Sequence, residues 1–132
     1  MKYLLDTDII IYYLKDLHGI SERINNYDLD DLAISIITYS ELLYGAFNSV
    51  RSKTNIKIIE KLFSKIRVLS FCDKSAYIYA EQKAILKKSG KILADLDLMI
   101  ASIAMHHDCT LITNNTKHFN RIKKLKLDNW CE

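Results

Sequence analysis

The pattern of apolar and polar positions along the chain predicts short buried strands that alternate with amphipathic helices. Short apolar runs bounded by polar or turn-forming residues are typical of buried strands. They lie at residues 3–5, 32–36, 68–71 and 110–113, with a last one within residues 125–130. Apolar positions three and four apart are typical of helices that bury one face. This spacing predicts helices over residues 9–14, 21–26, 38–48, 56–66, 73–88, 95–107 and 117–122.

The polar residues at the predicted helix starts indicate how these helices are capped. Asp8, Asp73 and Asp95 stand where an N-cap side chain would accept a backbone N–H. Thr38 and Glu41 have the spacing of a capping box, in which the glutamate returns a hydrogen bond to the cap residue.

The alternation of strands and helices predicts an α/β fold, an α/β/α sandwich with a central, mainly parallel sheet. The chain has no proline, only three glycines, and no repeat or low-complexity linker, which predicts one continuous domain over residues 1–132. Sites in such sheets form beyond the carboxyl ends of the strands. Asp6 and the turn at residues 113–115 fall at such ends.

Composition narrows the class of protein. Hydrophobic residues make up 49% of the chain, which suits one globular domain with a core. No apolar run approaches the roughly 18 residues of a membrane span, and the N-terminus has no signal-peptide pattern. Three widely spaced cysteines (Cys72, Cys109 and Cys131) form neither a disulfide framework nor a zinc motif. A cytoplasmic location without a membrane contact is expected.

The charge distribution is more informative than the net charge of +3. Basic residues gather in two segments, and such patches attract phosphate backbones. A solvated helix face and tail is the commoner explanation, so the basic segments serve as supporting evidence only. The two groups are Lys83, Lys87, Lys88 and Lys91, then Lys117, Arg121, Lys123, Lys124 and Lys126.

Three acids interrupt apolar segments far apart in the chain: Asp6 in YLLD, Glu41 in ITYSELLYGA and Asp97 in DLDLMIAS. Buried carboxylates without partners are strongly disfavoured, so acids that converge from such segments imply bound cations. A metal-dependent site that cuts phosphodiester bonds is the leading hypothesis.

Each acid has a structural alternative. Asp8 serves most simply as a helix cap, whereas Asp6 stands one position too early for that role and directly follows the strand. The capping box with Thr38 explains Glu41 as well as catalysis does. Asp97 shares a helix face with small and apolar residues, while Asp95 lies on a more polar face. Asp97 is therefore the better ligand candidate.

Thr113 and Asn115 follow an apolar strand, where an asparagine forms turns or contacts water or phosphate. The histidines, His118 included, have no zinc spacing and are interpreted as surface residues. Tyr12, Tyr13, Tyr39 and Tyr44 are interpreted as core or interface residues.

With these residues in view, the chain resembles the VapC toxins, the PIN-domain ribonucleases of type II toxin–antitoxin pairs. The resemblance rests on LLDTDIIIYYLK, ITYSELLYGA, GKILADLDLMIASIAMHHDCTLITNNTKHF and the closing LKLDNW, in family order and spacing. The three family acids fall on Asp6, Glu41 and Asp97. The fourth family position, often Asp, falls on Asn115, and Asp8 replaces the commoner Asn.

The resemblance implies a PIN-like α/β/α sandwich and an endoribonuclease that depends on Mg²⁺ or Mn²⁺. It implies a structured RNA substrate such as tRNA, a VapB-type antitoxin that fills the active-site groove, a homodimer and a higher toxin–antitoxin assembly. Asp6 and Asp97 would be the principal metal ligands, and Glu41 a ligand through water or a base. Asn115 and Thr113 would steady the water shell or phosphate, and the lysines would hold the RNA backbone.

Two alternatives remain open at this point. Asp6, Thr7 and Asp8 match the opening DxD of haloacid-dehalogenase-like phosphatases, in which Asp6 would be a covalent nucleophile. A catalytically inactive PIN binding module is the other, favoured only by Asn115.

Overall fold

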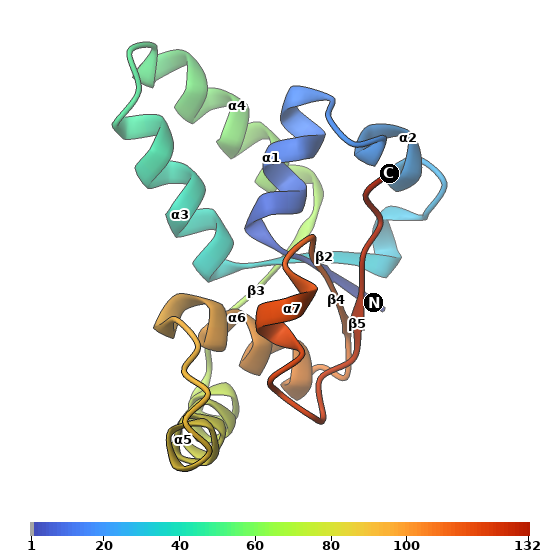
Figure 1. Ribbon diagram of the computed structural model, residues 1–132. Helices are drawn as coiled ribbons and strands as arrows, with labels where there is room; N and C mark the ends of the chain where they lie inside the picture. Colours follow the sequence, from blue (N-terminus) through green and yellow to red (C-terminus); the bar gives the residue numbers. More distant parts are fainter. Residues whose placement is uncertain (1) are drawn as a thin grey trace.

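The computed structural model describes residues 2–132 (Figure 1). Its centre is a five-stranded sheet in the order β3-β2-β1-β4-β5, in which every neighbouring pair is parallel. The predicted α/β fold is confirmed. The strands are β1 (Tyr3–Leu5), β2 (Leu32–Ser35), β3 (Arg67–Leu69), β4 (Thr110–Ile112) and β5 (Leu127–Asp128).

The helices lie where the apolar spacing predicts them, with ends shifted by a few residues. They are α1 (Thr7–Lys15), α2 (Ile20–Ile24), α3 (Ile36–Phe47), α4 (Ser52–Lys65), α5 (Asp73–Lys88), α6 (Asp95–His106) and α7 (Thr116–Phe119). A short 3₁₀ helix, η1 (Leu29–Asp31), occupies the acidic loop before β2. None of the helices within residues 2–132 is long and apolar enough to cross a bilayer.

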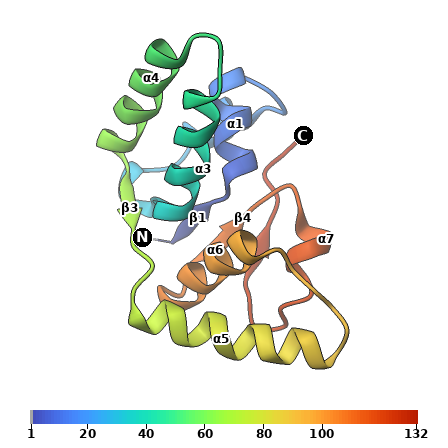
Figure 2. The same cartoon turned by 90° about the vertical axis from the view of Figure 1, so that its left-hand side faces the viewer.

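Helices cover both faces of the sheet, because successive residues of a strand point to opposite faces. Leu4 packs on one side with residues of α5, α6 and α7, and Leu5 packs on the other with residues of α1, α2 and α4. Both leucines are almost fully buried. Figure 2 shows α5 alongside α6 below the sheet, and α3 and α4 paired as a hairpin above it.

The strand order reverses at the centre of the sheet. From β1 the chain adds β2 and β3 on one side, and later β4 and β5 on the other. Where the order reverses in this way, the connections leave neighbouring strands in opposite directions and open a gap beyond their carboxyl ends. In this sheet the reversal lies between β1 and β4, which are followed directly by Asp6 and Thr113.

Two predicted helix caps are wrong, because two strands run into their helices without a loop. Asp6, and not Asp8, is the N-cap of α1, and its side chain accepts from the Thr7 N–H. Ser35, and not Thr38, is the N-cap of α3, and its side chain accepts from the Thr38 N–H at 3.0 Å. Asp6 directly follows β1, and Ser35 is the last residue of β2, so each helix is capped at the point where the strand ends.

The other two predicted caps are wrong by one residue. Asp73 and Asp95 are the first residues of α5 and α6, and the N-cap positions fall on Cys72 and Ala94, neither of which makes a side-chain cap bond. An acid in the first turn of a helix still stabilises it by interacting with the helix dipole. Asp73 and Asp95 therefore mark the starts of these helices, although neither is the N-cap.

Candidate active site

Asp6 is the only fully buried acid within residues 2–132, with 5% of its surface exposed. The Thr113 hydroxyl donates to Asp6 Oδ2 at 2.8 Å, and the Thr7 N–H donates to Oδ1 at 2.8 Å. Burial, followed by the nearby charge of Asp8, raises the pKa of Asp6 to about 7 even though both hydrogen bonds favour the charged form. The carboxylate is therefore fixed in position while its charge lacks compensation.

Asp8 fastens the turn after β4 to the start of α1. Its Oδ2 accepts the Asn114 N–H at 3.0 Å, and its Oδ1 accepts the N–H of Ile9 at 2.8 Å. The Asn114 side chain donates in turn to the Tyr12 hydroxyl at 3.3 Å. Burial raises the pKa of Asp8, while these backbone bonds oppose the rise. Asp8 thus has a structural role, although a different one from the predicted helix cap.

Glu41 faces the start of α1 from the second turn of α3. Its Oε1 accepts the Thr7 hydroxyl proton at 2.7 Å. No capping box forms, since α3 begins two residues before Thr38 and Ser35 takes the cap position. The capping-box explanation for Glu41 is therefore wrong. Its carboxylate instead binds Thr7, the residue that directly follows Asp6.

Asp97 occupies the first turn of α6 and is half-buried. Burial is the main cause that raises its pKa, the charges of Glu41 and Asp8 raise it further, and His118 opposes them. Repulsion of this kind requires that the carboxylates lie near one another. Asp6 also experiences the charge of Asp97, and Thr7 binds both Asp6 and Glu41. The three predicted acids therefore lie near one another, at the junction of β1 with α1, on α3 and on α6.

Asp95 lies two residues from Asp97 but points away from the acids. Its carboxylate binds Lys83 Nζ at 2.9 Å and the Tyr79 hydroxyl at 2.9 Å, both on α5. These bonds lower the pKa of Asp95. Asp95 thus links α5 to α6 and is not the predicted helix cap, and the assignment of Asp97 as the metal ligand stays a prediction.

Asn115 joins the site at its edge. Its backbone N–H donates to Thr113 Oγ1 at 3.0 Å, and its side-chain nitrogen lies 2.9 Å from His118 Nδ1. Asn115 is therefore linked by hydrogen bonds to Asp6 through Thr113, and to His118, whose charge acts on Asp97.

The sequence did not predict that His118 and Thr7 belong to the site. His118 is exposed, as expected of a surface residue, yet its charge acts on Asp97. Its position three residues after Asn115, on one turn of α7, was the available signal. Thr7 lies between two aspartates, and only the structure shows that its hydroxyl reaches Glu41 on another helix.

The donor set suits a hard divalent cation. Within residues 2–132, no three His, Cys, Asp or Glu side chains lie close enough to enclose a metal ion by themselves. Mg²⁺ does not need such a cage, because it keeps several waters and binds through one or two carboxylates and the substrate phosphates. Carboxylate oxygens at an open edge of the sheet fit Mg²⁺ or Mn²⁺ of this kind.

The family follows from two comparisons. The PIN domain family matches residues 3–125. Ribonuclease VapC1 of Haemophilus influenzae is 39% identical over 134 residues, which cover 100% of both chains. The chain belongs to the VapC family of PIN-domain ribonucleases. Another VapC relative, the tRNA(fMet)-specific endonuclease VapC of Salmonella typhimurium, is 32% identical over 132 residues, or 99% of each chain.

The fold of this VapC-family chain agrees with that assignment. The crystal structure of DNA-bound VapBC from Salmonella typhimurium contains a chain that matches it with a TM-score of 0.93 and 32% identity, over 99% of each chain. The resemblance of the four sequence segments to VapC is confirmed. The phosphatase alternative has no comparable support and is set aside.

The buried Asp6 carboxylate predicts an unusual pH dependence of stability for the metal-free protein. An acid whose pKa rises from 3.8 unfolded to about 7 folded lowers the stability progressively as pH increases through that interval, because the unfolded chain ionises first. We expect Asp6→Asn to raise the free energy of unfolding at pH 8 by about 1–4 kcal/mol, and to change it little at pH 4. Urea unfolding with a chelator present measures the difference.

Asp95→Asn is the matched control, because Asp95 is exposed and its pKa is lowered. It should show no gain at pH 8. Equal or lower stability of Asp6→Asn at pH 8 would contradict the assignment of a costly buried charge.

Proposed function

We propose that this chain is the endoribonuclease toxin of a VapBC-type toxin–antitoxin pair and that it hydrolyses phosphodiester bonds in RNA with the help of Mg²⁺ or Mn²⁺. The observation that carries the proposal is the convergence of Asp6, Glu41 and Asp97 at the carboxyl edge of the sheet in a VapC-family chain. A structured RNA such as tRNA is the proposed substrate, by analogy with the relative named a tRNA(fMet)-specific endonuclease.

Asp6 and Asp97 would hold the ion, and Glu41 would reach it directly or through water. When bound, the ion would help to deprotonate an attacking water and would stabilise the negative charge that develops on the phosphate. Burial and the neighbouring acids raise the pKa values of Asp6 and Asp97, so these carboxylates would exchange protons for a divalent cation, which would offset the repulsion among them.

The remaining polar groups of the site would orient the reactants. Glu41 would direct the attacking water and accept its proton, while the water oxygen bonds to phosphorus and the phosphodiester P–O bond breaks. Thr113 keeps the Asp6 carboxylate in place through its 2.8 Å bond. Asn115, beside His118, would contact the phosphate or the water shell.

Substitution of the acids tests this assignment. We expect Asp6→Asn and Asp97→Asn to remove RNA cleavage and Glu41→Gln to reduce it strongly, because each removes a charge that binds the ion or activates water. Cleavage of total RNA by antitoxin-free protein with Mg²⁺, and its loss with EDTA, is the measurement.

Asp95→Asn is the control, because Asp95 is exposed at the start of α6 and binds Lys83 and Tyr79 of α5. This variant should remain active. Full activity of Glu41→Gln would contradict the role of Glu41. A folded, metal-loaded wild-type protein that cleaves no RNA would favour the inactive binding module instead.

The two basic segments meet in a groove that we assign to the RNA backbone. The groove has a volume of about 310 Å³ and lies between the end of α5 and the segment after α7. Within residues 2–132, the ion pairs are Lys83 with Asp95 and Lys126 with Asp108, so the lysines of the groove have no carboxylate partner. It is lined by Glu81, Gln82, Ile85, Leu86, Ser89, Lys91, Arg121, Lys123 and Lys124.

The salt dependence of RNA binding tests the groove. Replacing Lys91, Lys123 and Lys124 with alanine should weaken binding and reduce the slope of log Kd against log salt by about 2–3, since each phosphate contact contributes about 0.7–0.9. The kcat should not change, because the groove does not include the acids. Fluorescence titration of a labelled tRNA over a range of salt concentrations gives the slope.

The matched control is the triple alanine variant of Lys53, Lys57 and Lys61 on α4, which removes the same charge from another helix. An equal loss of slope in both variants would show that net charge, and not the groove, determines binding.

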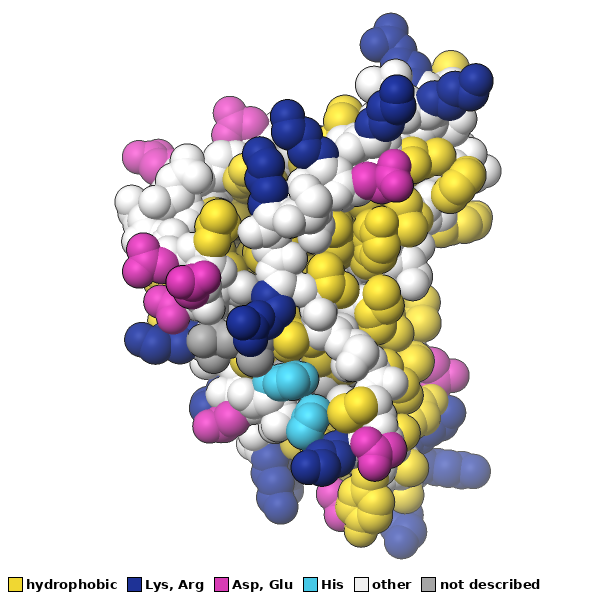
Figure 3. Space-filling view, turned by 180° about the vertical axis from the view of Figure 1, so that it is seen from behind, with side chains coloured by type: hydrophobic (Ala, Val, Ile, Leu, Met, Phe, Trp, Pro, Cys, Tyr) yellow, Lys and Arg dark blue, Asp and Glu magenta, His cyan; other side chains and the backbone are white. Residues whose placement is uncertain are grey.

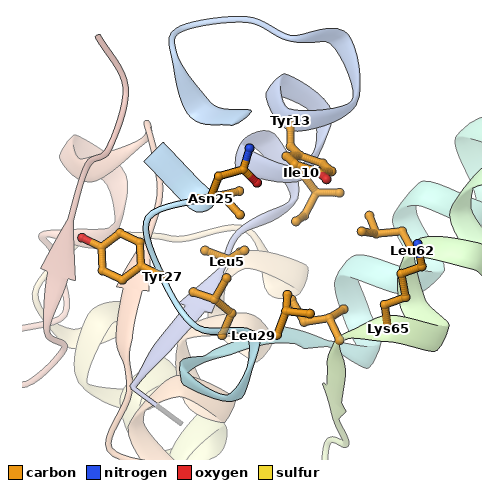
Figure 4. Close-up of a pocket in the computed structure, with 11 residues that line it drawn as sticks. Leu5, Ile10, Tyr13, Asn25, Tyr27, Leu29, Leu62 and Lys65 are labelled. Carbon is orange, nitrogen blue, oxygen red and sulfur yellow. The ribbon is translucent and has the colours of Figure 1, made fainter. Parts of the chain in front are cut away.

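Two apolar surfaces would serve the protein partners. A pocket of about 290 Å³ between α1, α2 and α4 is lined by Ile10, Tyr13 and Leu62 among others (Figure 4). We assign it to the VapB-type antitoxin, since it adjoins α1, the helix that has Asp6 as its N-cap. Solved relatives are VapBC complexes.

The second apolar surface would join two copies of this chain. Hydrophobic side chains gather along the edge that carries α3 and α4 at one end and α5 at the other (Figure 3). Ile36, Tyr44 and Phe47 share one face of α3 and are 36%, 70% and 67% exposed, and Tyr77 of α5 is 72% exposed. An exposed face with this many large apolar side chains is typical of an interface.

A charge placed on each surface distinguishes the two assignments. We expect Tyr13→Glu to abolish binding of the antitoxin without changing the dimer, and Phe47→Glu to give a monomer that still binds antitoxin. Light scattering measures the mass of the free protein and of its mixture with antitoxin. Each variant is the control for the other, and exchanged outcomes would contradict both assignments.

A further inference from the structure

A continuous set of hydroxyl groups lies behind Glu41. Thr7 Oγ1 lies 2.7 Å from Glu41 Oε1 and 3.0 Å from Thr38 Oγ1, and Ser35 Oγ lies 3.3 Å from Thr38 Oγ1. Ser35 and Thr38 are fully buried, and Thr7 is half-buried. The three hydroxyls come from the end of β2, the first turn of α3 and the first residue of α1.

The direction of these hydrogen bonds follows from the number of protons. A carboxylate only accepts, so Thr7 must donate its single hydroxyl proton to Glu41. Thr38 must then donate to Thr7, and Ser35 must donate to Thr38. The result is a one-way chain from Ser35 through Thr38 and Thr7 to Glu41, and the backbone N–H of Thr38 donates back to Ser35 Oγ at 3.0 Å.

Thr7 also contacts the other acid of this edge. Its backbone N–H donates to Asp6 Oδ1 at 2.8 Å while its hydroxyl donates to Glu41 at 2.7 Å. One residue therefore sets the separation of a carboxylate that follows β1 from one that lies on α3. Neither helix alone could do so, because Asp6 caps α1 whereas Glu41 lies on α3.

We propose that Thr7 is the positioning residue that holds Asp6 and Glu41 at the separation required for metal binding and catalysis, and that Ser35 and Thr38 orient its hydroxyl. The inference rests on the proposed ribonuclease function and deepens it. Thr7 acts through the two acids. Partners of this kind, which orient metal-binding carboxylates, typically change metal affinity or activity by about 10–100-fold when they are lost.

Removing the Thr7 hydroxyl while keeping the shape of the side chain tests the proposal. Thr7→Val should lower kcat by about 10–100-fold with little change in the KM for RNA, and should weaken Mn²⁺ binding in calorimetry. Thr7→Ser keeps the hydroxyl and should restore most of both. Thr38→Val leaves Thr7 without its orienting donor and should give a smaller loss in the same direction.

Thr110→Val is the matched control, because Thr110 is the first residue of β4 and lies at the amino ends of the strands, away from the acids. It should keep the wild-type kcat and Mn²⁺ affinity, and urea unfolding of each variant shows that it is folded. Wild-type kcat and Mn²⁺ affinity in Thr7→Val would overturn the inference, as would a Thr7→Ser variant as weak as Thr7→Val. If wild type binds Mn²⁺ without cleaving RNA, the proposed function fails and the Mn²⁺ affinities still decide the role of Thr7. A wild-type protein that does neither overturns both.

Discussion

The hydrogen bond between Thr113 and Asp6 is the interaction on which the arrangement of the site depends. In the parallel pairing of β1 with β4, Leu5 stands opposite Ile112, so the residues that follow are brought together. The Asp6 N–H donates to the Ile112 carbonyl at 2.9 Å, and the Thr113 hydroxyl then reaches Oδ2 of Asp6 at 2.8 Å. This contact closes the two central strands at the point where the strand order reverses. The turn after β4 and the first turn of α1 take their positions from it.

That position is costly for a carboxylate. The Asp6 side chain has little contact with water and lies near other acids, and burial, followed by the charge of Asp8, raises its pKa to about 7. Two hydrogen bonds only partly offset the loss of hydration. The fold tolerates the penalty because hydrophobic clusters on both faces of the sheet hold β1 and β4 in place. The unfavourable buried charge thus lies where a bound cation would offset it. Proteins commonly lose some stability at functional sites in this way.

The sequence predicted the elements well and their junctions poorly. Apolar periodicity is a local property, so it located the strands and most helices, and the alternation of the two gave the parallel sheet. The caps of α1 and α3 were misplaced since a direct passage from strand to helix leaves no loop residues to signal the start. The error mattered for Glu41, whose apparent capping box with Thr38 disappears once Ser35 is the cap. The contact of Thr7 with Glu41 joins residues 34 positions apart, and no local pattern reports it.

The three acids are held in different ways, which bears on how a cation would be received. Asp6 accepts bonds from two segments, and Glu41 accepts one from Thr7. Asp97 accepts no side-chain or backbone hydrogen bond within the described residues 2–132; its place is set by α6, which the contact of Asp95 with Lys83 joins to α5. A carboxylate that no protein donor satisfies keeps its lone pairs available, and burial, followed by the charge of Glu41, raises the pKa of Asp97. Asp97 is thus the acid whose carboxylate oxygens are freest to bind a cation, while Asp6 and Glu41 supply the fixed geometry around it.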